Sequence, residues 1–218
     1  MNAAAKMTLA VLLAATGGWL ASMAFNLPAM SKEPRYPQLT MEQLNSEQRP
    51  VAERIMSFSI VGLGGPYNAM LRSPAAATAT LDLLDYLRFH TSVPKRLNEF
   101  AIVIQARLWR NQLVWFGHAP AALKAGVSGQ TLAELKLNKR PTAMQPDEAA
   151  VYDFCTELYR RHVVSDETYA RLHAFLNDQQ IVDLTILSGT YGMVVSLLAM
   201  SEQGMPPGEA PPFKPGDP

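Results

Sequence analysis

Apolar residues recur at helical spacing along most of the chain, and no segment shows a convincing alternation of apolar and polar positions. Apolar residues three and four positions apart share one face of a helix, whereas a half-buried strand alternates with a period of two. The pattern therefore predicts an all-α bundle of about eight helices. The expected helices cover residues 47–60, 74–89, 94–110, a segment through His118 that stops at Gly126, 128–137, a segment from Pro146 through Cys155, 165–176 and 178–200.

The last of these helices is apolar on nearly all sides between residues 181 and 200, and it is long enough to be mistaken for a membrane span. Asp183, Thr185 and Thr190 lie within it. These polar residues, together with the amphipathic helices before it, favour a central core helix or a subunit interface. A single small bundle would struggle to cover this apolar surface, so we expect a homo-oligomer.

The two ends of the chain differ in composition from its centre. Residues 1–24 combine Lys6, an apolar stretch over 7–15 and the small residues Ser22 and Ala24, as an export signal does. This pattern predicts an exported or periplasmic protein; alternatively, the segment stays uncleaved and anchors the chain in the inner membrane. We expect a linker at 25–46, a globular domain at 47–203 and a proline-rich tail at 204–218.

Charge and cysteine content limit the possible partners. The chain carries 19 basic and 19 acidic residues and no recurring basic patch, so we expect no nucleic-acid partner. Its single cysteine excludes an intramolecular disulfide, and no cysteine–histidine cluster has the spacing of a zinc site, so we expect no metal. Cys155 shares a helical face with Val151, Phe154 and Leu158, which predicts a buried thiol.

A carboxylate and an imidazole are the candidate reactive groups in the centre of the chain. Glu99 lies among apolar residues of a helix that we expect to be buried, where a carboxylate needs a partner or a shifted pKa. Asn111, Val114, Trp115 and His118 follow at positions that share one helical face. We therefore expect Glu99 and His118 to face one pocket, with Trp115 and Asn111 on its wall.

Several motifs keep the order and spacing of a known family: Gly65-Pro66-Tyr67-Asn68, Ser73-Pro74, Tyr86-Leu87-Arg88-Phe89, Glu99, His118 and Ala125-Gly126-Val127-Ser128. On these motifs, about residues 50–200 resemble the carboxymuconolactone decarboxylase family, which also contains the AhpD-type alkylhydroperoxidases. The resemblance implies an AhpD-like helical bundle of the family's long form.

The chain departs from both branches of that family at one wall of the pocket. In the peroxidase branch the resemblance implies a glutamate, two cysteines and a histidine, of which Glu99 and His118 match the first and last. Asn111 and Val114 stand at the two cysteine positions, and without a thiolate the site supports neither peroxide reduction nor disulfide turnover. Decarboxylase-type members commonly carry glutamate at the position of Val114.

The resemblance implies a cofactor-free lyase that acts on a small carboxylated lactone or a related acid. No cofactor is needed because the conjugated lactone carbonyl of such a substrate can accept the electrons. His118 is the expected proton donor, since imidazole titrates near neutral pH, and Glu99 would orient it and raise its pKa. Residues expected to bind the substrate or form the pocket wall are Arg96 (or Arg88), Trp115, Asn111 and Tyr67.

Two alternatives stay open at this point. The first is an AhpD-type thiol-dependent peroxidase, which the missing cysteine pair disfavours. The second is a non-catalytic protein that keeps the family fold. In that case Glu99 would form a structural pair with Arg96 or Arg107, and His118 would only pack.

Overall fold

The computed structural model describes residues 33–59 and 61–214, and in this part of the chain it contains helices and no strand. The all-α prediction is therefore confirmed. A 3₁₀ turn, η1 (Met41–Gln43), precedes the first α-helix, and a π-helical turn, η2 (Tyr86–His90), follows the third. The predicted signal or anchor at 1–24 lies outside the described residues. The α-helices are α1 (Gln48–Met56), α2 (Pro66–Met70), α3 (Pro74–Asp85), α4 (Lys95–Leu108), α5 (Gln112–Lys124), α6 (Gly129–Lys136), α7 (Pro146–Arg161), α8 (Asp166–His173) and α9 (Asp178–Ser201).

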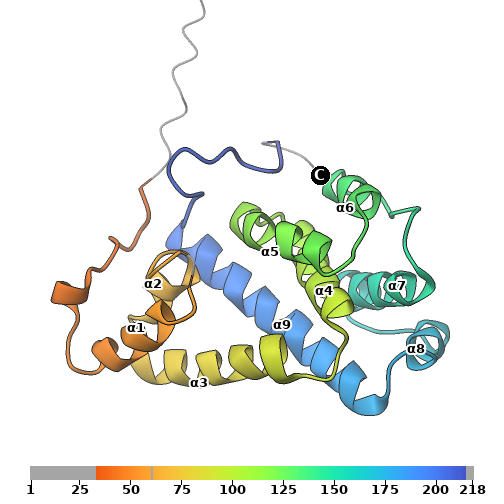
Figure 1. The fold of residues 1–218 in the computed structure, drawn as a ribbon, viewed down its shortest axis with the longest axis horizontal. Helices are drawn as coiled ribbons and strands as arrows, with labels where there is room; N and C mark the ends of the chain where they lie inside the picture. The colour runs from red at the N-terminus through yellow and green to blue at the C-terminus, as the bar shows by residue number, and fades with distance from the viewer. Residues whose placement is uncertain (1–32, 60, 215–218) are drawn as a thin grey trace, which may run out of the picture. The chain divides into compact units, whose positions relative to one another are not determined.

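Helices α4 and α9 form the centre of the bundle. Figure 1 shows α9 running between α1, α2 and α3 on one side and α4, α7 and α8 on the other. Helix α4 packs against α5, α7 and α9, and every residue from 97 to 107 of α4 is buried. Polar side chains in this part of α4 therefore need hydrogen-bond partners within the protein, and Asn98 finds one in the carbonyl oxygen of Leu87 (2.8 Å).

Helix α9 is, within the described residues, long and apolar enough to cross a membrane by length and composition. Of its most apolar 18-residue window, however, 56% is buried within the protein. Its buried Asp183 accepts hydrogen bonds from Tyr86 Oη (3.0 Å) and Thr91 Oγ1 (2.6 Å). This helix is therefore a core element of the bundle. Val182 and Ile186 remain exposed on its other face, and the homo-oligomer stays a prediction.

Local sequence signals set where the helices begin. Pro66 and Pro74 occupy the first turn of α2 and α3, where the missing N–H costs nothing. Gly65, just before α2, has φ of 60°, a left-handed conformation that side chains resist. The Asn111 side chain accepts a hydrogen bond from Val114 N (2.9 Å) and caps α5. This cap fixes the start of the helix that carries the candidate histidine.

The folded part of the chain extends beyond the expected 47–203 range at both ends. Phe213 is buried, and its backbone N–H and C=O bond to the Gln112 side chain at 2.7 and 3.1 Å. Arg35 donates to Met200 O (2.6 Å) and pairs with Glu202 (2.7 Å). Parts of the expected linker and tail are therefore packed on the bundle.

Candidate active site

The Glu99 carboxylate is held inside the bundle by two partners. Its side chain is 2% exposed; Oε1 accepts from Lys95 Nζ at 2.7 Å, and Oε2 lies 2.8 Å from His118 Nδ1 on α5. Burial by itself raises the pKa of the Glu99 carboxyl, but the hydrogen bonds and charges of His118 and Lys95 outweigh it and lower that pKa. Glu99 is therefore an ionised acceptor at neutral pH.

His118 joins Glu99 to Tyr191 of α9. Its Nε2 lies 3.1 Å from Tyr191 Oη, and the two rings meet edge to face with centroids 5.2 Å apart. Burial lowers the pKa of His118 and outweighs the opposing effect of Glu99, and the charges of Arg88 and Lys95 lower that pKa further. The predicted rise in the His118 pKa is therefore wrong, because burying an imidazolium costs more than one carboxylate partner returns.

These pKa directions locate the protons between the three residues. A carboxylate only accepts hydrogen bonds, so Nδ1 of neutral His118 carries the proton and donates it to Glu99. The other nitrogen, Nε2, is then an acceptor, and the Tyr191 hydroxyl donates to it. Burial raises the pKa of Tyr191, which keeps this hydroxyl protonated. The three side chains form one hydrogen-bonded series, called here the Glu99–His118–Tyr191 chain.

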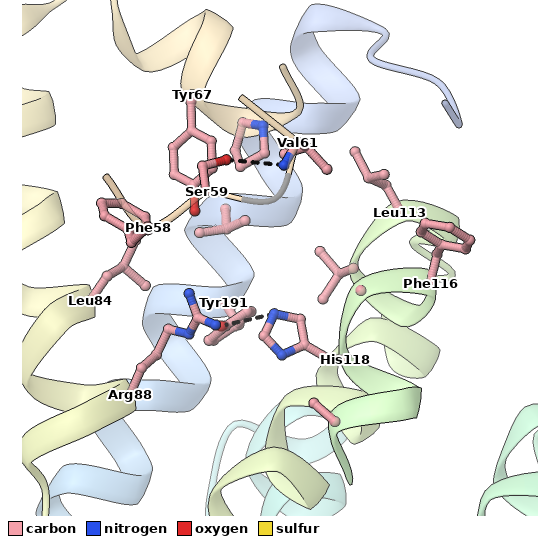
Figure 2. Close-up of a pocket in the computed structure, with 15 residues that line it drawn as sticks. Phe58, Ser59, Val61, Tyr67, Leu84, Arg88, Leu113, Phe116, His118 and Tyr191 are labelled. Atoms are coloured by element: carbon pink, nitrogen blue, oxygen red, sulfur yellow. Dashed lines mark hydrogen bonds between the residues drawn. The ribbon is translucent and has the colours of Figure 1, made fainter. Parts of the chain in front are cut away.

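The Glu99–His118–Tyr191 chain ends at a cavity of about 190 Å³. His118, Tyr191 and Tyr67 line it, from α5, α9 and α2 respectively (Figure 2). An apolar cavity of about 150 Å³ holds benzene, so this cavity has room for a small organic molecule. Most other lining side chains are apolar: Phe58, Val61, Leu84, Leu113, Val114, Phe116 and Val194.

Arg88 brings a permanent positive charge to the same cavity. In Figure 2 its guanidinium points towards Tyr191 and His118. Arg88 lies in η2, where Thr91 N bonds to Tyr86 O at 2.9 Å, although the sequence pattern predicted an α-helix as far as residue 89. Such π turns re-aim side chains and are frequent at functional sites. Arg88 Nε is buried without a hydrogen-bond partner among the described residues, so a bound acceptor would satisfy it.

Arg96 does not line the cavity, contrary to its expected role in substrate binding. Its guanidinium pairs with Asp147 and Glu148 of α7, both at 2.6 Å, and ties α4 to α7. Two carboxylates thus neutralise this charge within the fold. The expected alternative of a structural Glu99 pair with Arg96 or Arg107 is also wrong, since the partners of Glu99 are His118 and Lys95.

Of the other residues expected at the pocket wall, Tyr67 lines the cavity, whereas Trp115 and Asn111 do not. The Trp115 ring packs edge to face on Phe213, with centroids 5.1 Å apart. The Asn111 side chain is occupied in capping α5. Both were predicted from the helical face that they share with His118, and the docked C-terminal segment and the cap determine where they point.

Two contacts of the site were not predicted from the sequence. Lys95 stands four residues before Glu99, the usual spacing for an ion pair on a helix, and this spacing could have indicated the contact. Tyr191 is a buried tyrosine on a mainly apolar helix, and a buried tyrosine hydroxyl needs a partner. Nothing in the sequence pattern indicates that this partner is His118, which lies 73 positions away.

The arrangement as a whole suits proton transfer to a small anion. It provides a neutral imidazole backed by a carboxylate, a protonated tyrosine and a half-buried guanidinium at one cavity. Positioned acid–base groups and preorganised charge are the means by which proteins stabilise developing enolates. In the part of the chain that the structure describes, no three His, Cys, Asp or Glu side chains gather as a metal site would require.

The lowered pKa of His118 predicts that acid destabilises the fold. The unfolded chain binds a proton at His118 near its ordinary pKa of 6.5, whereas the folded chain resists protonation. The stability that the fold gains from keeping His118 neutral is fully present above pH 6.5. It is lost as the pH falls towards the lower folded-state pKa, because the unfolded chain then binds a proton that the folded chain does not. Urea unfolding between about pH 7.5 and 5.5 should show this loss in the wild type and a shallower slope in His118→Gln. Equal slopes would contradict the lowered pKa.

Comparisons with known proteins place the fold. No protein-family model and no curated protein matches the chain. A crystal structure of an alkylhydroperoxidase AhpD core, an uncharacterized peroxidase-related protein from Ralstonia eutropha, superposes with a TM-score of 0.67 and 14% identity, over 80% of this chain and 93% of that one. An uncharacterized peroxidase-related protein from Silicibacter gives a TM-score of 0.67 and 16% identity, over 81% and 94%. The chain therefore has the AhpD-like helical fold, as its sequence resemblance predicts.

Proposed function

We propose that this protein is a cofactor-free lyase that removes carbon dioxide from a small carboxylated lactone or a related acid. The observation that carries the proposal is the Glu99–His118–Tyr191 chain, which ends at a mainly apolar cavity that the half-buried cation Arg88 also lines. Decarboxylation of such an acid needs a place for the anion, stabilisation of the enolate that forms, and a proton for it. The cavity offers a group for each.

The first step of the proposed reaction breaks the carbon–carbon bond between the substrate and its carboxylate. Carbon dioxide leaves, and the electron pair of that bond moves into the conjugated lactone carbonyl, which gives a dienolate. The negative charge shifts from the carboxylate to the carbonyl oxygen without leaving the cavity. Arg88 can neutralise it before and after the shift, because its planar guanidinium presents several donors.

A proton then returns to carbon through the Glu99–His118–Tyr191 chain. The anionic substrate and dienolate favour protonation of His118, which is neutral in the free protein. The Tyr191 hydroxyl gives its proton to the dienolate carbon, and His118 Nε2 re-protonates the tyrosine oxygen. Glu99 holds the imidazolium through Nδ1. One proton from water is consumed for each carbon dioxide released, so the reaction is balanced.

Carbon dioxide release from a panel of carboxylated lactones tests the proposal. The wild-type protein should release carbon dioxide, with uptake of one proton, from at least one member of the panel and without an added cofactor. If no member is decarboxylated, the non-catalytic alternative becomes the preferred one.

A thiol-dependent peroxidase is the second candidate because both superposed proteins are described as peroxidase-related. The chemistry of this chain disfavours it. Asn111 and Val114 stand where that mechanism needs cysteines. Cys155 is fully buried, and burial raises the pKa of its thiol to about 12. A thiol with such a pKa carries almost no nucleophilic thiolate at neutral pH.

We therefore expect no significant turnover of an organic hydroperoxide with a thiol donor. The measurement is peroxide consumption by the wild type beside Cys155→Ser, which replaces the thiol by a smaller hydroxyl that cannot form a thiolate. Both proteins should match the rate without enzyme. Turnover that disappears in Cys155→Ser would overturn this expectation.

A further inference from the structure

We infer that Arg88 and Tyr67 form the carboxylate subsite of this cavity, and that its ligand is an acid with one negative charge on an otherwise apolar body. The inference rests on the proposed function for its chemistry and narrows the substrate class. A dicarboxylic acid, which is equally compatible with a lyase of this kind, is not the expected ligand.

The first support is an inventory of the polar groups that line the cavity. Ser59 Oγ already donates to Gly62 O (2.8 Å) and accepts from Val61 N (3.2 Å). His118 uses one nitrogen for Glu99 and the other for Tyr191. Among the described lining residues, two side chains keep a hydrogen-bond donor without a partner. These are Arg88, whose buried Nε has no partner, and Tyr67, whose hydroxyl has none.

Arg88 is held in place without having its charge neutralised. Its guanidinium stacks on the Phe89 ring, 4.9 Å from the ring centroid. Lys95 Nζ donates to the Arg88 carbonyl oxygen at 3.2 Å, which anchors the main chain of η2. No carboxylate pairs with Arg88 among the described residues. This differs from Arg96, which two carboxylates neutralise, and a positioned cation without a counter-ion favours an anionic ligand.

Tyr67 is suited to be the second donor of the subsite. It lines the cavity beside Arg88, and burial raises the pKa of its hydroxyl although Arg88 opposes this effect. The hydroxyl therefore keeps its proton at neutral pH and can donate to a carboxylate oxygen. Its ring meets Phe58 edge to face with centroids 5.8 Å apart, and this contact limits its movement.

The shape of the space around the subsite gives the body of the ligand. A second cavity, also of about 190 Å³, shares Phe58, Tyr67, Leu84 and Arg88 with the first. Arg88 and Tyr67 therefore lie where the two cavities adjoin. A carboxylate bound there would leave the rest of the ligand against the phenylalanine, leucine and valine side chains that line the first cavity. Those surfaces favour a ring or a branched hydrocarbon.

A second carboxylate on the ligand has no partner in the cavity that contains His118. Arg88 is the one permanently charged side chain among its described lining residues. A further anion would lose its water against apolar walls, and ionised Glu99 lies behind His118. Burying an unpaired charge is costly, so dianions should bind worse than monoanions of the same size.

Direct binding to small acids tests the subsite without any turnover. Isothermal titration of the wild type with benzoate, its neutral analogue benzamide and the dicarboxylate terephthalate provides ligands that share one ring. Benzoate should bind, and the other two should bind at least about tenfold more weakly. Arg88→Met should weaken benzoate binding by about tenfold or more, the scale of a hydrogen bond to a charged group.

Matched variants separate the subsite from general effects of charge or folding. Arg140→Met removes one positive charge at an exposed ion pair with Asp153 and should leave benzoate binding unchanged. Arg88→Lys keeps the charge and loses the planar fork, so its binding should be intermediate. Tyr67→Phe should weaken benzoate binding by a smaller factor than Arg88→Met, and far-ultraviolet circular dichroism should confirm that each variant is folded.

Three results would overturn the inference: no detectable binding of benzoate to the wild type, equal binding by Arg88→Met, or tighter binding of terephthalate than benzoate. These results are distinct from a failure of the lyase proposal. Benzoate binding that depends on Arg88 and Tyr67, without decarboxylation of any lactone, would leave the subsite in place and remove the lyase. Decarboxylation of a dicarboxylic substrate, together with tighter binding of terephthalate than of benzoate, would support the lyase and overturn the monocarboxylate subsite.

Discussion

Replacing His118 by alanine should lower kcat by about 100-fold or more on whichever acid the wild type decarboxylates. This is the usual scale for losing a positioned acid–base group. His118 is the only link between Glu99 and Tyr191 among the described residues, so its loss also removes the supply of protons to the tyrosine. The measurement is the steady-state rate of carbon dioxide release at saturating substrate.

Two further variants control this experiment. His90→Ala removes an exposed histidine whose partner is Asp85, and it should leave kcat unchanged. Tyr191→Phe keeps the ring and removes the hydroxyl that gives its proton to the dienolate carbon, so it should lower kcat by about 100-fold or more, as His118→Ala does. A His118→Ala enzyme with wild-type kcat would place proton transfer elsewhere.

The substitution Glu99→Ala, which removes the buried carboxylate, should lower the free energy of unfolding by about 2–3 kcal/mol. The change leaves the buried Nδ1–H of His118 without an acceptor, and an unsatisfied buried donor costs this much. Lys95 loses its partner at little cost because its side chain is 52% exposed. Urea unfolding at neutral pH provides the measurement.

The matched changes are Glu99→Gln and Glu53→Ala. Glutamine keeps the shape and an acceptor oxygen for His118, so it should cost less than about 1 kcal/mol while still lowering activity. Glu53 is exposed on α1, and its replacement should change stability by less than about 0.5 kcal/mol. Equal stability of Glu99→Ala and Glu53→Ala would mean that the Glu99–His118 contact contributes nothing to the fold.

Much of the fold could be predicted because helical periodicity and capping residues are local signals. The start of α3 at Pro74 follows from residue type and neighbours alone. Asn111, which was expected on the pocket wall, caps α5 instead. The π turn at residues 86–90 could not be predicted, since it depends on how η2 meets α4 and α9. The same limit applies to Phe213, one apolar residue in a proline-rich stretch whose burial depends on a distant partner.

The candidate site was predictable only where the residues themselves indicate a contact. Glu99 and His118 could be paired because a buried carboxylate requires a partner, and the family resemblance supplied the second residue. The positions of Arg96 and Trp115 could not be inferred from spacing, because α7 and the C-terminal segment determine where these side chains point. The direction of the His118 pKa shift depends on the balance between burial, which lowers the pKa, and Glu99, which raises it. The size of neither effect can be read from a sequence.

Nitrogen-15 spectra of the histidine side chains, recorded from about pH 8 to about pH 5, test the central claim most directly. The signals of His118 are identified by their absence in His118→Gln. We predict a neutral ring near pH 7 with the proton on Nδ1, and a titration midpoint below 6.5. An imidazolium with protons on both nitrogens at neutral pH would contradict this arrangement, and so would a neutral ring with its proton on Nε2. In the proposed arrangement, Nδ1 donates to Glu99 and Nε2 accepts from the Tyr191 hydroxyl.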